Sequence, residues 1–150
     1  MSEQATQQTI IDAPPERCFA VAVDFEHYPT WASDVKEVAV LRRDDDGRGG
    51  LVCFRAAAMG RSTTYTLQYF YGSNPLRMAW KLVEGDVTRQ LDGEYLFEAV
   101  EGDNDRTLVS YHLVADIVVP LPGFVKRRAE ARIMRSALEQ LRTQVEAQVR

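Results

Sequence analysis

The sequence predicts an α+β fold in which a curved, antiparallel sheet of seven strands is covered by a long C-terminal helix. Between residues 35 and 118, segments rich in β-branched and aromatic residues alternate with short stretches of turn residues. Parallel neighbours would need crossover helices, which these gaps could not hold, so successive strands must run antiparallel. The chain then repeats apolar residues at helical spacing. A sheet with one apolar face needs a cover, and this helix supplies it.

The N-terminal part of the chain predicts one strand followed by two short helices. The strand is expected over Thr6–Ile11. The stretch 12–16, Asp-Ala-Pro-Pro-Glu, indicates a helix start, with Asp12 as the capping acid and prolines in the first turn. Pro29 biases the residue before it away from helical geometry. Residues 24–31 are therefore expected to form a turn followed by one short helical turn.

The remaining strands and the long helix follow from the pattern of apolar and turn residues. The strands are expected at Val35–Arg43, Leu51–Ala58, Ser62–Tyr71, Arg77–Val83, Val87–Ala99 and Thr107–Val118. A break at 120–123, Pro-Leu-Pro-Gly, separates the last strand from the helix. The apolar stripe of the helix is expected to comprise Ala129, Ile133, Met134, Ala137, Leu138, Leu141, Val145 and Val149.

Alternation along the strands assigns many aromatic residues to the concave face of the sheet. A sealed core would favour aliphatic residues, because each buried tyrosine hydroxyl needs a partner. An aromatic lining with scattered hydroxyls is typical of a small-molecule cavity. The alternative is a solid core with the hydroxyls at its rim. The inward set is expected to be Val52, Phe54, Ala56, Tyr65, Leu67, Tyr69, Tyr71, Met78, Trp80, Leu82, Leu91, Gly93, Tyr95, Phe97, Val109, Tyr111, Leu113, Ala115 and Ile117.

Length, net charge and residue composition exclude several classes of function. A chain of 150 residues suits one domain spanning 1–150. The net charge of −4 argues against nucleic-acid binding, which needs a basic face. The sequence has no apolar run of membrane-spanning length, and its N-terminus lacks the apolar core of a signal peptide, so a cytoplasmic location is expected. Cys18 and Cys53 match no metal or redox spacing.

The sequence does not predict a catalytic set, a metal site or a cofactor. His27 and His112 are far apart and have no cysteine at ligand spacing. His27 could act as a base oriented by Glu26, but a lone histidine beside acids is more often a surface residue. No arginine, aspartate or histidine alternates clearly inward to assist the tyrosines. We therefore assign no catalytic residue.

A basic cluster, Lys126-Arg127-Arg128, lies near the N-terminal end of the predicted long helix. Positive charge is unfavourable there because of the helix dipole. The cluster is either a solvated run compensated by nearby acids, which is the favoured interpretation, or a contact for an anionic group such as a lipid headgroup or phosphate. The second case allows peripheral membrane contact, or contact with a macromolecular partner, without stable membrane insertion.

Several motifs together resemble a known family. They are 13–19 (Ala-Pro-Pro-Glu-Arg-Cys-Phe), 24–31 (Asp-Phe-Glu-His-Tyr-Pro-Thr-Trp), 35–38 (Val-Lys-Glu-Val), 93–95 (Gly-Glu-Tyr) and 120–129 (Pro-Leu-Pro-Gly-Phe-Val-Lys-Arg-Arg-Ala). The chain resembles the START-related (SRPBCC) superfamily of helix-grip proteins, in its polyketide cyclase/dehydrase and coenzyme Q-binding branch. The resemblance implies a deep cavity between sheet and C-terminal helix, where relatives hold sterols, lipids, quinones or polyketides. It implies no shared catalytic residue, and it places Tyr28, Pro29 and Trp31 near the cavity mouth.

The residue pattern and the family resemblance lead to two hypotheses for the function. The first is binding and transport of a hydrophobic or amphipathic small molecule, such as a lipid, a quinone or a polyketide-like compound. The alternative is a polyketide cyclase/aromatase or dehydratase that uses Tyr65, Tyr69, Tyr95 or Tyr111 as proton donors. The ligand-binding residues are expected to be Phe25, Tyr28, Trp31, Phe54, Tyr65, Tyr69, Met78, Trp80, Tyr95, Tyr111, Phe124 and Met134. Among them, Phe25, Tyr28 and Trp31 are expected to form an aromatic gate.

Overall fold

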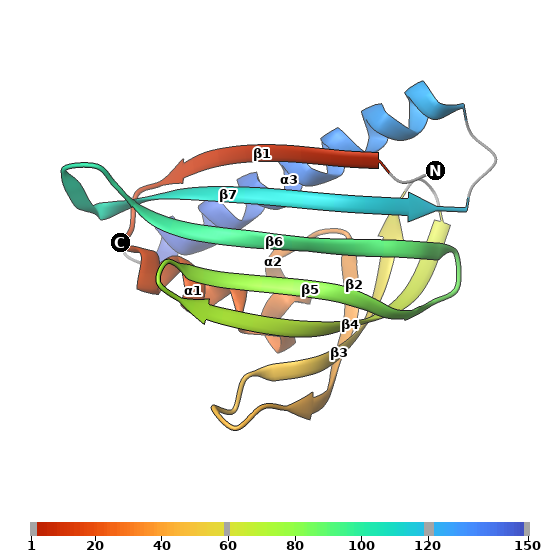
Figure 1. The fold of residues 1–150 in the computed structure, drawn as a ribbon, viewed down its shortest axis with the longest axis horizontal. Helices are drawn as coiled ribbons and strands as arrows, with labels where there is room; N and C mark the ends of the chain where they lie inside the picture. Colours follow the sequence, from red (N-terminus) through yellow and green to blue (C-terminus); the bar gives the residue numbers. More distant parts are fainter. Residues whose placement is uncertain (1–2, 59–60, 119–121, 149–150) are drawn as a thin grey trace.

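In a computed structural model, which describes residues 3–58, 61–118 and 122–148, seven strands form one antiparallel sheet (Figure 1). The strand order is β1-β7-β6-β5-β4-β3-β2, so β2 to β7 form a meander and β1 pairs with the last strand. The strands are β1 (Glu3–Ile11), β2 (Val35–Arg43), β3 (Gly49–Ala58), β4 (Arg61–Ser73), β5 (Leu76–Gly85), β6 (Thr88–Val100) and β7 (Asp103–Ile117). The helices are α1 (Pro15–Ala22), the 3₁₀ turn η1 (Phe25–His27), α2 (Tyr28–Trp31) and α3 (Gly123–Gln148).

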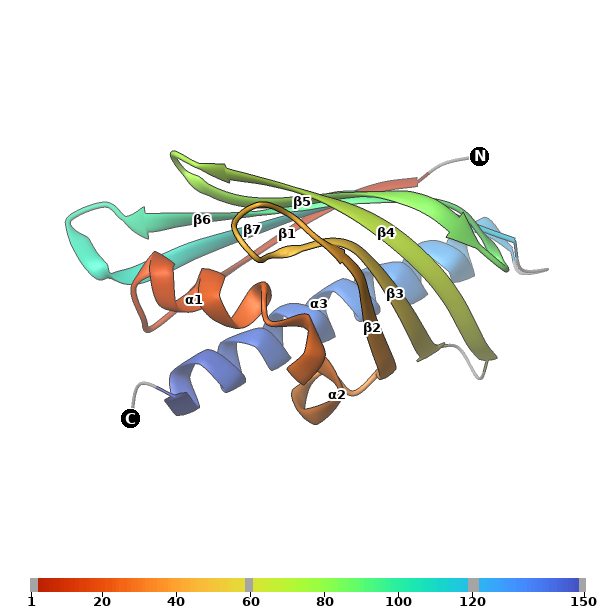
Figure 2. The ribbon, with the colours of Figure 1, turned by 90° about the horizontal axis from the view of Figure 1, so that it is seen from below.

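The sheet curves around α3, and α1 and α2 lie on the same concave side (Figure 2). The strand β1 runs alongside α3, where the Gln7 side-chain amide donates to the Ala131 carbonyl at 2.9 Å. This arrangement confirms the predicted α+β helix-grip fold, with two short helices after the first strand. The predicted stripe residue Val149 and the predicted break residues Pro120 and Leu121 lie outside the described residues.

Strand boundaries differ from expectation where tight turns let the pairing continue. Ser73 pairs with Leu76, and Val100 pairs with Asp103, so β4 and β7 extend into stretches of turn residues. These residues have low strand propensity, but the antiparallel partner supplies their backbone hydrogen bonds. In the turn between β2 and β3, Gly47 adopts φ 82°, a conformation that glycine tolerates without strain.

The prediction that Asp12 caps α1 is wrong. Pro14 occupies the N-cap position without a side-chain hydrogen bond, and Pro15 is the first helical residue. The backbone N–H of Asp12 instead donates to the Glu146 carboxylate at 2.9 Å. Proline at the first position needs no N–H partner, so the helix can begin without a capping side chain. The Asp12 contact joins the beginning of α1 to the end of α3.

A candidate ligand-binding cavity

A cavity of about 230 Å³ lies between the concave face of the sheet and α3. Its walls come from the inward faces of β3 to β7, from α2 with the residues that follow it, and from one side of α3. Aromatic and aliphatic side chains form most of the lining. The sheet and helix residues among them include Phe54, Ala56, Tyr65, Leu67, Tyr69, Met78, Trp80, Leu91, Tyr95, Tyr111, Leu113, Ile133, Ala137 and Leu141.

Most of the predicted ligand-binding residues line this cavity. Strand alternation identified those on the sheet, because residues two apart share one face, whereas the family resemblance placed Tyr28 and Trp31 near the cavity mouth. The predicted residues found in the lining are Tyr28, Trp31, Phe54, Tyr65, Tyr69, Met78, Trp80, Tyr95 and Tyr111. Whether they bind a ligand stays a prediction.

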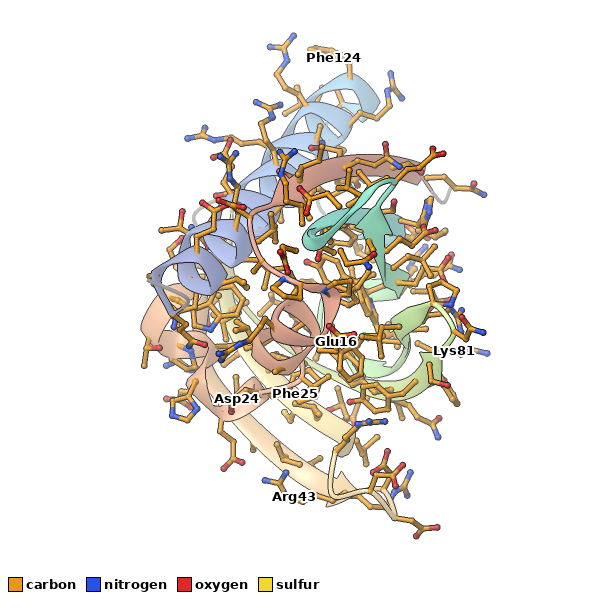
Figure 3. The ribbon with its side chains drawn as sticks, turned by 90° about the vertical axis from the view of Figure 1, so that its left-hand side faces the viewer. Glu16, Asp24, Phe25, Arg43, Lys81 and Phe124 are labelled. Atoms are coloured by element: carbon orange, nitrogen blue, oxygen red, sulfur yellow. The ribbon has the colours of Figure 1, made fainter. Side chains whose placement is uncertain are left out.

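Three of the residues predicted to bind a ligand, Phe25, Met134 and Phe124, lie outside the cavity lining. Phe25 is buried behind the lining, with its ring centroid 4.5 Å from that of Tyr69. Met134 is fully buried in the core, while its neighbour Ile133 faces the cavity. Phe124 is 60% exposed in the first turn of α3, and Figure 3 shows it at the tip of the helix, well away from Phe25.

The short helix α2 brings two aromatic rings to the cavity wall. The ring centroids of Tyr28 and Trp31 are 5.0 Å apart, and the Tyr28 ring lies 5.4 Å from that of Phe25. The Tyr28 hydroxyl donates to the Ala22 carbonyl at the end of α1, which holds the two helices together. Trp31 is half-buried, so one part of its ring meets solvent. The predicted gate thus consists of two lining rings supported from behind by Phe25.

The tyrosine hydroxyls of the cavity are neutral hydrogen-bonding groups. Burial raises the pKa of Tyr69, Tyr95 and Tyr111 well above the usual value near 10. The hydroxyls of Tyr95 and Tyr111 interact with each other, and their ring centroids lie 4.4 Å apart. These phenols remain protonated at neutral pH, so they can donate to a ligand carbonyl or hydroxyl but cannot act as bases.

A carboxylate that the sequence reading missed also lines the cavity. Asp34 lies between α2 and β2, is half-buried, and accepts a 2.8 Å hydrogen bond from the Ala57 N–H through its backbone carbonyl. Burial and the nearby Asp34 charge raise the pKa of Tyr65 to about 12. This corrects the expectation that no aspartate faces inward. Alternation could not find Asp34, because a residue outside a strand has no period-two pattern.

Other polar residues of the lining are fixed by contacts outside the cavity. The Thr63 hydroxyl donates to the Asp86 carboxylate at 2.5 Å. Gln140 accepts from the Ser33 N–H at 3.1 Å and donates to the Ser33 hydroxyl at 2.7 Å. These bonds tie α3 to the segment that carries Asp34. The lining therefore combines an apolar body with a small polar region contributed by this segment, β4 and α3.

His27 lies outside the lining, on the exposed surface of η1. Its Nδ1 is 2.7 Å from the Asp24 carboxylate, and this hydrogen bond raises the pKa of the imidazole. Glu26 pairs with Arg43 instead and does not orient the histidine. His112 lies within 2.9 Å of the Thr6 hydroxyl on the exposed side of β7. No group of three metal-ligating side chains occurs among the described residues.

The basic cluster occupies the first turns of α3. Arg127 and Arg128 are exposed, whereas Lys126 is half-buried. From Phe124 to Arg135 the helix carries five basic side chains and one acid, Glu130, in a chain with a net charge of −4. Within the described part of the chain, no helix is long and apolar enough to cross a membrane.

Comparison with solved structures shows the same fold in several proteins. A START superfamily protein from Mycobacterium smegmatis has a TM-score of 0.87 at 21% identity, covering 96% of this chain and 97% of that one. The Zhui aromatase/cyclase from a Streptomyces species has a TM-score of 0.85 at 15% identity, covering 100% and 97%. A protein from Thermus thermophilus has a TM-score of 0.78 at 24% identity, covering 97% and 98%. At these identities the likeness shows the fold alone.

Sequence comparison gives the family. No curated protein matches the chain significantly. The family model described as polyketide cyclase/dehydrase and lipid transport matches residues 2–146, nearly the whole chain. Because it covers more than half of the chain, this match establishes that the chain belongs to the polyketide cyclase/dehydrase and lipid transport family.

Proposed function

We propose that this protein binds and transports a hydrophobic or amphipathic small molecule in the cavity under α3. The observation that carries the proposal is the composition of the cavity wall, in which aromatic and aliphatic side chains surround a few hydrogen-bonding groups. Such a wall favours a largely apolar ligand, and the few polar groups orient it. Lipids, quinones and polyketide-like compounds all have this character.

The cavity volume favours a compact ligand. About 230 Å³ lies below the roughly 300–1,000 Å³ typical of small-molecule sites. A molecule with one ring system or one short chain suits this space better than a lipid with two long acyl chains. Rings such as Trp80 and Tyr111, whose centroids lie 5.8 Å apart, present flat apolar surfaces to such a ligand.

Native mass spectrometry of protein purified from its own host tests the proposal directly, together with thermal shifts against a panel of lipids, quinones and aromatic polyketides. A ligand present at 100 times its Kd should stabilise the fold by about 2.7 kcal/mol. Ala137→Leu supplies a matched variant, because Ala137 lines the cavity from α3 and a larger side chain would fill it. Ala147→Leu places the same change on the exposed side of α3.

Binding that disappears in Ala137→Leu and persists in Ala147→Leu is the expected result. A cavity found empty in protein from its own host, with no thermal shift against any member of the panel, would overturn the proposal. Equal binding by both variants would place the ligand elsewhere on the protein.

A second candidate is cyclisation or dehydration of a polyketide-like substrate in the same cavity. Asp34 favours it, because a carboxylate can accept a proton while the neutral Tyr95–Tyr111 pair donates to a ketone oxygen. A poly-β-keto thioester is the suitable probe. Asp34→Asn and Tyr111→Phe should each lower its turnover at least tenfold, whereas unchanged turnover in both variants would remove this candidate.

Peripheral contact with an anionic membrane surface is also proposed, for the N-terminal half of α3. The basic side chains there are joined by the exposed ring of Phe124, a combination suited to an interface with anionic headgroups. Co-sedimentation with phosphatidylserine vesicles tests the contact. Reversing Arg128, Arg132 and Arg135 to glutamate should abolish co-sedimentation, and unchanged co-sedimentation would exclude this surface.

A further inference from the structure

We propose that the polar region of the cavity selects a ligand with a cationic nitrogen head and rejects a carboxylate. The inference rests on the proposed binding function and adds the chemical class of the ligand. Asp34, Trp31 and Tyr65 define the region, and all three line the cavity. Three features of the molecule support it: the charge of the lining, the rings around Asp34, and a second acid next to the cavity wall.

The charge of the lining has one sign. Among the described residues that line the cavity, Asp34 is the one with a carboxylate side chain, and none is lysine, arginine or histidine. No basic side chain that the structure describes lies within ion-pair distance of Asp34. Nearby Lys36 donates instead to the Ser33 carbonyl at 2.8 Å. A ligand that displaces water from this carboxylate must replace the lost hydration, which a cation does and an anion cannot.

The rings beside Asp34 also favour positive charge. Trp31, Tyr28, Phe54 and Tyr65 form a continuous series, with successive ring centroids 5.0, 6.1 and 5.5 Å apart. Aromatic faces attract cations through their quadrupole, and ammonium groups are commonly bound by several rings together. The charge of Asp34 acts on the hydroxyl of Tyr65, the last ring of the series. The Asp34 carboxylate and these rings therefore both favour positive charge in the same part of the cavity.

A second acid lies directly behind the cavity wall. The Thr63 side chain lines the cavity and donates to Asp86, which also accepts from the Thr64 N–H at 3.0 Å. These hydrogen bonds lower the pKa of Asp86, so this group stays ionised at neutral pH. The negative charge near Thr63 adds to that of Asp34. An anionic ligand head would therefore meet repulsion mainly from Asp34, because Asp86 is exposed and water screens its charge.

Phenylbutylamine, phenylbutanol and phenylbutyrate share one apolar skeleton and differ in the charge of the head, so their Kd values at neutral pH test the inference. The amine should bind most tightly and the acid most weakly, with at least a tenfold ratio, the lower end of what a hydrogen bond to a charged group contributes. Asp34→Asn is nearly isosteric and keeps the backbone bond to Ala57. Asp45→Asn makes the same charge change at an exposed turn residue.

The amine-to-acid ratio should fall to about twofold in Asp34→Asn and stay unchanged in Asp45→Asn. Binding of the alcohol without a preference between amine and acid would overturn this inference and leave the proposed function standing. Preferential binding of phenylbutyrate, or a preference that survives in Asp34→Asn, would overturn it as well. Failure of all three compounds to bind would count against the proposed binding function itself.

Discussion

Gly93 allows the Trp80 indole to approach the backbone of β6 closely, and this contact yields a quantitative prediction. A Cβ atom at position 93 would lie 2.6 Å from the His112 carbonyl oxygen and 2.7 Å from Cζ2 of Trp80. Both distances are shorter than real Cβ contacts, so Gly93→Ala must displace the indole or the backbone. Overpacking of this kind costs about 1–3 kcal/mol. Reduced freedom of the unfolded chain offsets about 0.4–1 kcal/mol.

The net destabilisation of Gly93→Ala is therefore centred on about 1.3 kcal/mol, or a fall in Tm of about 3–5 °C for a chain of this size. Gly50→Ala is the matched control, because a Cβ there meets its nearest neighbour, the Arg42 carbonyl oxygen, at 3.5 Å. Thermal and urea unfolding followed by circular dichroism measure the difference, and Trp80 emission in a Trp31→Phe background reports movement of the indole. Equal stability of the two variants with unchanged emission would refute the reasoning.

Three other predictions concern the short helical segments and the C-terminal end of α3. Trp31 emission should change on ligand binding, whereas His27→Ala should leave the Kd nearly unchanged, because this histidine is exposed and outside the lining; calorimetry checks the second point. The pKa of His27 should exceed 6.5 by NMR titration and should fall in Asp24→Asn. Any stabilisation by the His27–Asp24 pair is therefore present below pH 6.5 and is lost as the pH rises through the raised pKa of His27. Glu146→Ala should destabilise the fold by about 1 kcal/mol, because the Asp12 N–H just before α1 loses its acceptor. Glu139→Ala is the control and should leave the stability unchanged in the same urea titration.

The strands were the most predictable part of the structure. A period of two assigns each residue of a strand to one face, so Tyr65, Met78 and Tyr95 could be placed in the lining from sequence alone. The order of the elements followed from gaps too short for crossover helices. Boundaries were less predictable, because pairing with a partner strand extends a strand into turn residues such as Asp103.

The sequence could not predict which residues of α3 meet the cavity, nor where residues between the elements lie. Ile133 and Met134 both belong to the apolar stripe of α3, and such a stripe is too wide to tell which residue meets a cavity and which meets solid core. Asp34 lies between elements, where no period exists, and its position depends on how α2 packs against β2. Its carboxylate is the strongest chemical feature of the lining and was the hardest to predict.

The free-energy cost of leaving the cavity unfilled indicates that the cavity is retained for a purpose. At about 24 cal/mol per Å³, leaving 230 Å³ unfilled would cost about 5.5 kcal/mol, an upper bound because part of the space is open to water. This is a large fraction of the 5–15 kcal/mol that stabilises a typical domain. Small residues such as Ala56 and Ala137 face the aromatic wall without filling it, although one larger side chain would remove much of the void. Increased stability together with lost binding in Ala137→Leu would show that the space serves a ligand, whereas a solid core would have no reason to keep alanine there.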